Sequence, residues 1–227
     1  MCLIKWQDSL NSWINHNQKM QMFLQILSIL IPVLFAITLH EVGHGWAAKQ
    51  FGDRTAEIQG RLTLNPIAHM DPIGTVLLPG LLLYLGGLVF GWAKPVPINP
   101  MNLGNPKRDM FFVAIAGPAA NLLMTCFWSI FFTVSVYLFG EQHYLHPYII
   151  LMAQTGVFIN LVLMVFNLLP IPPLDGGRVL RSVVNEKIGR TIDLIEPYGF
   201  FIVVGLLFLG ALQPIFKIVQ SIATIFI

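Results

Sequence analysis

The sequence predicts an all-α polytopic membrane protein, a bundle of about four to six transmembrane helices with a re-entrant segment and a small β-hairpin. Of its 227 residues, 56% are hydrophobic and only 11% are charged, whereas soluble domains carry about 25% charged residues. The mean hydropathy is +0.72. The apolar residues also gather in runs that match the roughly 20 residues needed to span a bilayer as a helix.

Five apolar runs define the expected organisation. They are 22–39, 73–90, 111–139, 148–169 and 198–227. Residues 1–20 precede them, and their apolar side chains, two tryptophans included, share one helical face, which is typical of a helix lying in the membrane interface.

Residues 21–227 are expected to form a single intramembrane domain, because the runs follow one another without a long polar linker. The expected parts are a first helix at 21–50, a β and re-entrant region at 54–99, core helices at 110–140 and 147–170, an amphipathic helix within 171–190, and a C-terminal helical region at 191–227.

The second run differs from the others because Pro79-Gly80 and Gly86-Gly87 interrupt it. Such dipeptides weaken a continuous helix, so we expect this segment to enter the membrane and return. On either side of it, residues 57–64 alternate in polarity and two prolines keep residues 93–98 extended. These two pieces are expected to pair as a hairpin.

The loop charges indicate the orientation in the membrane. Basic residues follow the first, second and fourth runs, whereas the loop at 140–147 has neither lysine nor arginine. Because positively charged loops stay cytoplasmic, all three basic loops share that side if the second run returns. We therefore expect a multi-pass protein of the cell (inner) membrane. The net charge of +2, without a basic stripe, indicates no nucleic-acid partner.

The first run ends in His40-Glu41-Val42-Gly43-His44. Histidines at i and i+4 lie on one helical face about 6 Å apart, so both imidazoles can reach one zinc ion. Glu41 is displaced around the helix and can hold a water molecule without being a ligand. An ionisable residue in a membrane segment is costly and usually marks function.

A zinc hydrolase normally supplies three protein ligands and leaves one position open. The histidines of the 140–147 loop are poor candidates, because they lie across the bilayer from the end of the first helix. Asp175 lies just beyond the fourth run, but it could equally be the N-cap of a following helix, and spacing leaves both roles open. The candidates for the third ligand are His69, Asp71, His143, His146 and Asp175.

A zinc ion shared by the first helix and Asp175 constrains the topology. His40 and His44 lie at the C-terminal end of the first helix, and Asp175 follows the C-terminal end of the fourth run. The two helices must then be parallel, which requires that the second run does not cross. The loop charges favour the same arrangement independently.

The chain carries HEVGH at 40–44, NPIAHMDPIG at 65–74, GPAAN at 117–121 and NLLPIPPLDGG at 167–177. In this combination it resembles the site-2 protease family of intramembrane zinc metalloproteases, peptidase family M50. The short 140–147 loop stands where larger members insert a PDZ domain, and no CBS-like tail follows. The resemblance is therefore to the compact, prokaryotic type.

The resemblance implies roles for six residues. His40, His44 and Asp175 would bind one zinc ion, and Glu41 would be the catalytic base. Asn167 would help to hold the substrate backbone. Asn121 would bind substrate as well, or form a helix-to-helix hydrogen bond in the core, and both roles stay open.

The predicted activity is hydrolysis of peptide bonds in or near transmembrane segments, as in regulated intramembrane proteolysis, near the cytoplasmic side. The partners would be membrane-protein or peptide substrates and the lipid bilayer; the sequence specifies no oligomeric state. An unwound substrate could pair with the extended pieces by strand addition. The alternatives are an inactive relative that only binds membrane proteins and a metal transporter. A transporter predicts charges or ligands in several helices, but the third and fourth runs contain no charged residue.

Overall fold

The structure is a computed structural model that describes residues 2–84, 91–138, 140 and 142–227. The membrane-length helices are α1 (Cys2–Gln50), α4 (Pro106–Leu138) and α5 (His146–Asn167). Shorter helices follow in chain order: α2 (Thr55–Ile58), η1 (Pro66–His69), η2 (Pro72–Leu77), α3 (Leu78–Tyr84), η3 (Pro100–Asn102), α6 (Asp175–Val183), α7 (Glu186–Ile195), η4 (Glu196–Tyr198), α8 (Gly199–Phe208) and α9 (Gln213–Phe226).

Four helical stretches within the described residues are long and apolar enough to cross a membrane: 17–50, 106–138, 146–167 and 186–208. The prediction of a polytopic helical protein is therefore confirmed. The last apolar run, 198–227, is divided into α8 and α9, because the chain turns at Gly210, whose φ is +70°.

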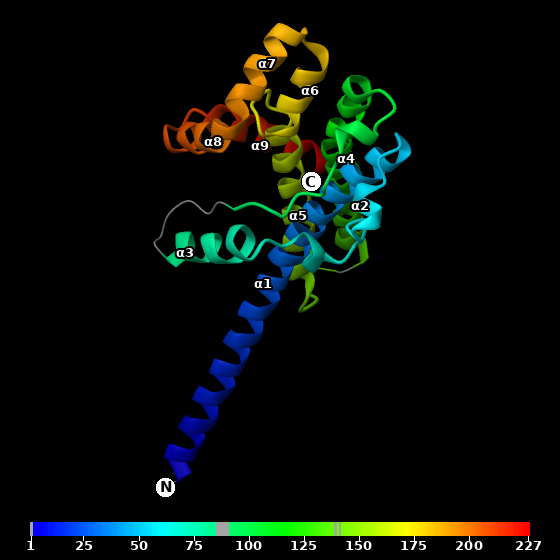
Figure 1. Cartoon of the computed structure of the whole chain (residues 1–227). Helices are drawn as coiled ribbons and strands as arrows, with labels where there is room; N and C mark the ends of the chain where they lie inside the picture. Colours follow the sequence, from blue (N-terminus) through cyan, green and yellow to red (C-terminus); the bar gives the residue numbers. More distant parts are fainter. Residues whose placement is uncertain (1, 85–90, 139, 141) are drawn as a thin grey trace.

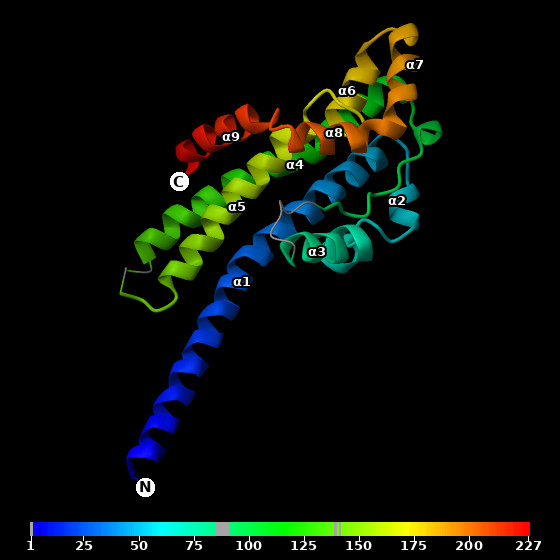
Figure 2. The same cartoon turned by 90° about the vertical axis from the view of Figure 1, so that its left-hand side faces the viewer.

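The core of the bundle consists of α1, α4 and α5, which all pack against one another. In Figures 1 and 2, α4 runs antiparallel to α1, and α5 runs back in the direction of α1. The first and fourth apolar runs are thus parallel, as the shared metal site requires. The C-terminal ends of α1 and α5 lie at the same end of the bundle as the start of α4.

Large apolar side chains cover much of the outside of this bundle. Its interior combines small and polar side chains with an apolar cluster around Trp128, Val157 and Leu161. Leu123 is 72% exposed and Ile130 is 65% exposed, whereas Asn121 and Asn160 are completely buried. Lipid accommodates the apolar surface, and helices in a membrane associate through small residues and hydrogen bonds. At one contact, a Cβ on Gly43 of α1 would lie 2.8 Å from the carbonyl oxygen of Ala116 in α4.

The predicted hairpin is wrong: no strand occurs in residues 2–84, 91–138, 140 and 142–227. Residues 55–58 form α2 instead, and the buried Asp53 accepts the Thr55 N–H at its start. Residues 93–98 are extended but unpaired with any strand. Pro95 and Pro97 lack the N–H groups that a ladder needs.

The predicted re-entrant segment is not supported. Its first part forms η2 and α3, a short apolar helical stretch that extends sideways from α1 in Figure 1, and residues 85–90 lie outside the described residues. The chain between α1 and α4 begins and ends at the same end of the bundle, so it makes no net crossing. The predicted amphipathic segment 1–20 is continuous with the first apolar run in α1, and its place in the membrane interface stays a prediction.

Candidate metal centre

Three side chains from distant parts of the chain converge at one end of the bundle. His40 and His44 come from the last turns of α1, and Asp175 is the first residue of α6. The Nε2 atoms of the two histidines are 3.1 Å apart, and each lies 3.2 Å from Oδ2 of Asp175. All three side chains are buried.

A tight turn brings Asp175 to the histidines. After α5 the chain reverses through residues 168–174, and α6 begins directly over that turn. A Cβ on Gly176 would lie 2.3 Å from the Leu168 carbonyl oxygen, and one on Gly177 would lie 2.6 Å from the Pro172 nitrogen. The turn can close this tightly only because both residues are glycines.

The proton on His44 is fixed by its surroundings. Nδ1 of His44 lies 2.7 Å from the carbonyl oxygen of Val113 in α4. A carbonyl oxygen only accepts hydrogen bonds, so Nδ1 must carry the proton and donate it. The lone pair of neutral His44 therefore lies on Nε2, which faces Asp175.

A chain of buried amides fixes His40 in the same way. Asn160 in α5 donates from Nδ2 to the Gly156 carbonyl oxygen, so its Oδ1 accepts from Asn121 Nδ2 at 2.9 Å. Asn121 Nδ2 also donates to the Ala36 carbonyl oxygen. Its Oδ1 is then left to accept from His40 Nδ1 at 2.6 Å, which places the His40 lone pair on Nε2. Such partners orient metal-binding histidines in proteins.

The donor set fits a zinc ion. Two imidazole lone pairs and a carboxylate oxygen face one another, and Oδ2 of Asp175 is buried without a hydrogen-bond donor. Three acceptors in contact repel one another unless a cation lies between them. Ligands about 2.0–2.1 Å from a tetrahedral zinc ion are about 3.3 Å apart, close to the 3.1 and 3.2 Å separations here. These three residues are a possible metal site.

The other proposed third ligands have different partners. Nε2 of His69 donates to the Thr63 carbonyl oxygen, and Asp71 accepts from two backbone N–H groups at the start of η2. His143 and His146 lie in and just after the loop between α4 and α5, at the opposite end of these helices. The alternative role of Asp175 is not seen, since it begins α6 and its Oδ2 accepts no hydrogen bond.

Gly117 of the GPAAN motif leaves space for the imidazoles. A Cβ at this position would lie 2.3 Å from Nε2 of His44 and 2.8 Å from Cε1 of His40. Real Cβ atoms do not approach that closely. Any larger residue here would therefore displace a ligand.

Glu41 is held apart from the three ligands. Its Oε2 accepts the backbone N–H of Val96 at 2.8 Å, and the side chain is partly buried. Val96 lies in the extended segment 93–98, far from α1 in sequence. Glu41 thus adjoins His40 in sequence without belonging to the group of three candidate ligands.

The two asparagines predicted to bind substrate have different surroundings. Asn121 is completely buried and makes the helix-to-helix hydrogen bonds described above, the second of its two expected roles. Asn167 is partly buried at the end of α5, where its Nδ2 donates to the Leu163 carbonyl oxygen. A substrate contact by either residue stays a prediction.

Sequence reasoning missed Asn160, the Val96 N–H and the Val113 carbonyl oxygen that accepts from His44. Asn160 belongs to none of the quoted motifs, although a polar residue within an apolar helix is itself a signal of function. Val96 contributes a backbone N–H, which no side-chain pattern can indicate.

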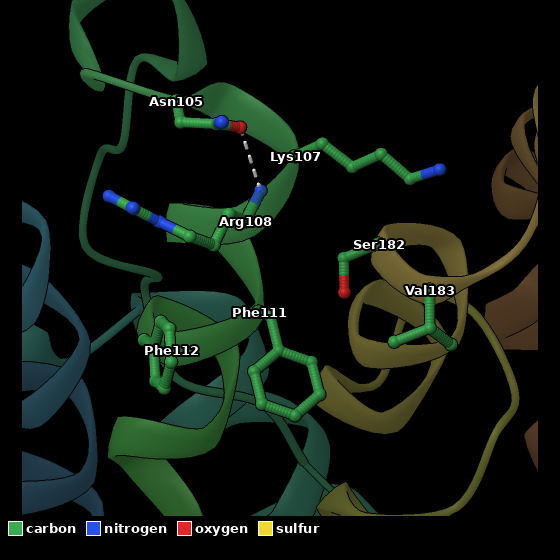
Figure 3. Close-up of a pocket in the computed structure, with 7 residues that line it drawn as sticks. All are labelled: Asn105, Lys107, Arg108, Phe111, Phe112, Ser182 and Val183. Atoms are coloured by element: carbon green, nitrogen blue, oxygen red, sulfur yellow. Dashed lines mark hydrogen bonds between the residues drawn. The ribbon is translucent and has the colours of Figure 1, made fainter.

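A shallow pocket lies elsewhere, between the start of α4 and the end of α6 (Figure 3). Its volume is about 410 Å³, and none of the three ligands lines it. Both of its cations are already engaged, because Lys107 donates to the Val184 carbonyl oxygen and Arg108 pairs with Asp109. Its lining residues are Asn105, Lys107, Arg108, Phe111, Phe112, Ser182 and Val183.

Fold and site together define a class: helical membrane proteins in which an HExxH helix and a distant aspartate form a possible metal site. The family model of peptidase family M50 matches residues 28–154 and 144–210. The chain therefore belongs to peptidase family M50 and is a zinc metalloprotease.

Relatives from three organisms also carry zinc metalloprotease in their names. YwhC of Bacillus subtilis, named as a zinc metalloprotease, is 38% identical over 77% of this chain and 77% of its own length. Rip2 of Mycolicibacterium smegmatis, with the same description, is 35% identical over 79% of this chain and 66% of its own length. Zinc metalloprotease MJ0392 of Methanocaldococcus jannaschii is 28% identical over 74% of this chain and 37% of its own length. No solved structure matches.

Proposed function

We propose that this metalloprotease cleaves peptide bonds in or near the transmembrane segments of membrane proteins, as in regulated intramembrane proteolysis. The observation that carries the proposal is the position of the candidate metal centre. Its three ligands are buried at the end of a helical bundle whose outer surface is apolar. A substrate segment that reaches this centre must therefore come from the membrane or its surface.

His40, His44 and Asp175 would hold the zinc ion, which when bound polarises the scissile carbonyl group and makes water more acidic. Glu41 would accept a proton from the attacking water molecule and deliver it to the leaving amine. The Val96 N–H keeps the Glu41 carboxylate oriented and away from the ligand positions. Asn167, at the end of α5, would hold the substrate backbone.

A helical substrate must unwind before cleavage, because its carbonyl groups are engaged in helix hydrogen bonds. The extended segment 93–98 offers few donors to such a substrate. Two of its residues are prolines, the Lys94 N–H donates to His69, and the Val96 N–H donates to Glu41. Strand addition to this segment is therefore not included in the proposal.

The active site would face the cytoplasmic side of the cell membrane. The loops with basic residues lie at the end of the bundle where α1 ends and α4 begins. The opposite loop, between α4 and α5, contains no lysine or arginine. Since positively charged loops stay cytoplasmic, the metal centre would lie near that face.

Co-expression with single-span candidate substrates tests the activity. Wild-type chain should cleave a substrate within or beside its span, and Glu41→Gln should reduce the cleavage rate by about 10²- to 10⁴-fold. Glu57→Gln is the matched control, because this glutamate lies on α2 in a surface ion pair. Cleavage that survives Glu41→Gln would overturn the proposal.

Thiol labelling tests the orientation. In a chain with Cys2 and Cys126 replaced by serine, a cysteine at Lys187 should react with an impermeant reagent only after the cells are opened. A cysteine at Gln142, in the loop between α4 and α5, should react in intact cells. The reverse pattern would place the active site on the outer side.

A further inference from the structure

Residues Trp92–Ile98 form an extended segment, here called the strap, that passes the C-terminal part of α1. Two hydrogen bonds attach its first residue to η2. The Trp92 N–H donates to the Gly74 carbonyl oxygen at 3.1 Å, and the Thr75 hydroxyl donates to the Trp92 carbonyl oxygen at 2.8 Å. The strap is therefore attached although it belongs to no sheet.

Arg61 and His69 hold the middle of the strap. Arg61 Nη2 donates to the Lys94 carbonyl oxygen at 2.8 Å, and the Lys94 N–H donates to the His69 carbonyl oxygen at 2.9 Å. The His69 ring, 1% exposed, donates to the Thr63 carbonyl oxygen and so fixes the turn that presents this backbone. One residue thus binds the strap by its side chain and the other by its backbone.

Arg61 is unusual because it is a nearly buried cation, 8% exposed, with no acidic partner in the part of the chain that the structure describes. Burying a charge without a counter-ion is costly. Its guanidinium group instead donates to backbone oxygens of the strap, at Lys94 and, at 3.4 Å, Pro95. Because burial of the charge is costly, we interpret Arg61 as a residue that holds the strap and not as an ordinary surface charge.

The next residue of the strap donates to the proposed catalytic base. The Val96 N–H lies 2.8 Å from Oε2 of Glu41, one residue beyond the Arg61 contacts. The Val96 side chain is 6% exposed and packs over Gly45, where a Cβ would lie 2.9 Å from Val96 Cγ1. The direction of this N–H is therefore set by the backbone on which Arg61 and His69 act.

We infer that Arg61 and His69 are positioning residues for the protease reaction, which they influence through the strap and its hydrogen bond to Glu41. The inference rests on the proposed role of Glu41 as base. A glutamate on a helix has three rotatable side-chain bonds, and this hydrogen bond selects one orientation of its carboxylate. Loss of either positioning residue frees the carboxylate of Glu41. It does not disturb the proposed metal ligands, because α4 orients His40 and His44 and α6 carries Asp175.

A double-mutant cycle on the full-length chain in proteoliposomes tests the inference, with a fluorogenic transmembrane peptide as substrate. Val96→Pro removes the N–H and should lower kcat by about 10- to 100-fold, the effect of one hydrogen bond to a charged group. Val96→Ala removes only side-chain packing and should lower kcat less. Arg61→Ala should lower kcat by about 10-fold or more, with KM and zinc content close to wild type.

The double variant distinguishes positioning from a merely structural role. If Arg61 acts through the Val96 N–H, kcat of Arg61→Ala with Val96→Pro should be no lower than that of Val96→Pro alone, because the two losses share one path. Losses that multiply, or an Arg61→Ala protein that loses zinc along with activity, would overturn the inference.

Conservative variants keep the test decisive if Arg61→Ala fails to fold. Arg61→Lys keeps a donor and should recover part of kcat relative to Arg61→Gln, and His69→Gln should recover part relative to His69→Ala. Equal kcat values within each pair would contradict the inference. Cleavage by Glu41→Gln would instead contradict the role of Glu41, so the two failures are distinguishable.

Discussion

His40 and Glu41 are neighbours in sequence, but different regions of the molecule hold them. His40 is oriented by Asn121 and Asn160, which lie on the membrane helices α4 and α5. Glu41 is oriented by Val96, which lies in the connection between α1 and α4. The helix core thus sets the geometry of the proposed metal ligands, and the connection sets the geometry of the proposed base.

This separation predicts two kinds of mutational effect. Changes within the bundle should alter zinc binding, whereas changes in the connection should alter turnover or stability and leave zinc in place. The two regions meet at the last turns of α1, where His40 and Glu41 face different partners. Variants in each region test whether zinc binding and turnover are controlled separately.

The largest effect is expected for Gly117→Ala. The new Cβ would lie 2.3 Å from His44 Nε2, so the imidazole must move and zinc affinity should fall by more than about 10-fold. Metal analysis of the purified protein measures this loss. Gly205→Ala in α8 is the control, since a Cβ there meets nothing within 4 Å; equal zinc content in both variants would contradict the prediction.

Asn121→Ala should weaken zinc binding by roughly 10- to 100-fold, because His40 Nδ1 loses its buried acceptor. Asn160→Ala should have a smaller effect, since Asn121 keeps its bond to the Ala36 carbonyl oxygen. Competition with a chelator measures both affinities. Wild-type zinc affinity together with a raised KM in Asn121→Ala would support the substrate role instead.

Asp53→Ala tests the connection. This buried carboxylate accepts from Thr55, Asn99 and Asn102, and so ties the end of α1 to the residues that follow the strap. Its loss should lower stability by about 1–3 kcal/mol, measured by thermal unfolding in detergent, with zinc affinity unchanged. Lost zinc would contradict the division between the two regions.

The stability effect of Asp53 should depend on pH. Burial by itself would raise the pKa of Asp53, but hydrogen bonds from Thr55, Asn102 and Asn99 outweigh it and lower the pKa below its ordinary value. The stabilisation is then complete above the ordinary pKa of about 4 and is lost as the pH falls through the folded-state pKa. Wild type and Asp53→Ala should therefore converge in stability on acidification.

The smallest effect is expected for Lys49→Ala. Lys49 pairs with Glu57 on the surface, where both side chains remain about one-third exposed to solvent. Such pairs contribute about 0–1 kcal/mol. Thermal unfolding should show a shift smaller than that of Asp53→Ala, and a larger shift would mean that the charged surface stabilises the connection more than its buried hydrogen bonds do.

Side-chain patterns were sufficient to predict most of the helical core. Apolar runs of bilayer length located α1, α4 and α5, and the i, i+4 spacing placed His40 and His44 on one face. The loop charges and the position of Asp175 required α1 and α5 to be parallel, as Figures 1 and 2 show. These features depend on the spacing of side chains and on the length of apolar runs, and both can be read from a single sequence.

The connection between α1 and α4 was predicted poorly because backbone hydrogen bonds determine it. Alternating polarity at 57–64 indicated a strand, but Asp53 instead supports a helical turn at Thr55. Pro95 and Pro97 did keep the strap extended, yet the same prolines prevent it from forming a ladder. The contact between Val96 and Glu41 joins residues 55 positions apart, and neither local pattern indicates it.

Two purified variants measured side by side distinguish the proposed base from the proposed third ligand. Zinc content and cleavage of a transmembrane peptide are determined for Glu41→Gln and Asp175→Ala. The proposed separation of base and ligands predicts that Glu41→Gln keeps its zinc but loses cleavage, and that Asp175→Ala loses both. Zinc bound by Asp175→Ala with wild-type affinity would contradict the assignment of the third ligand.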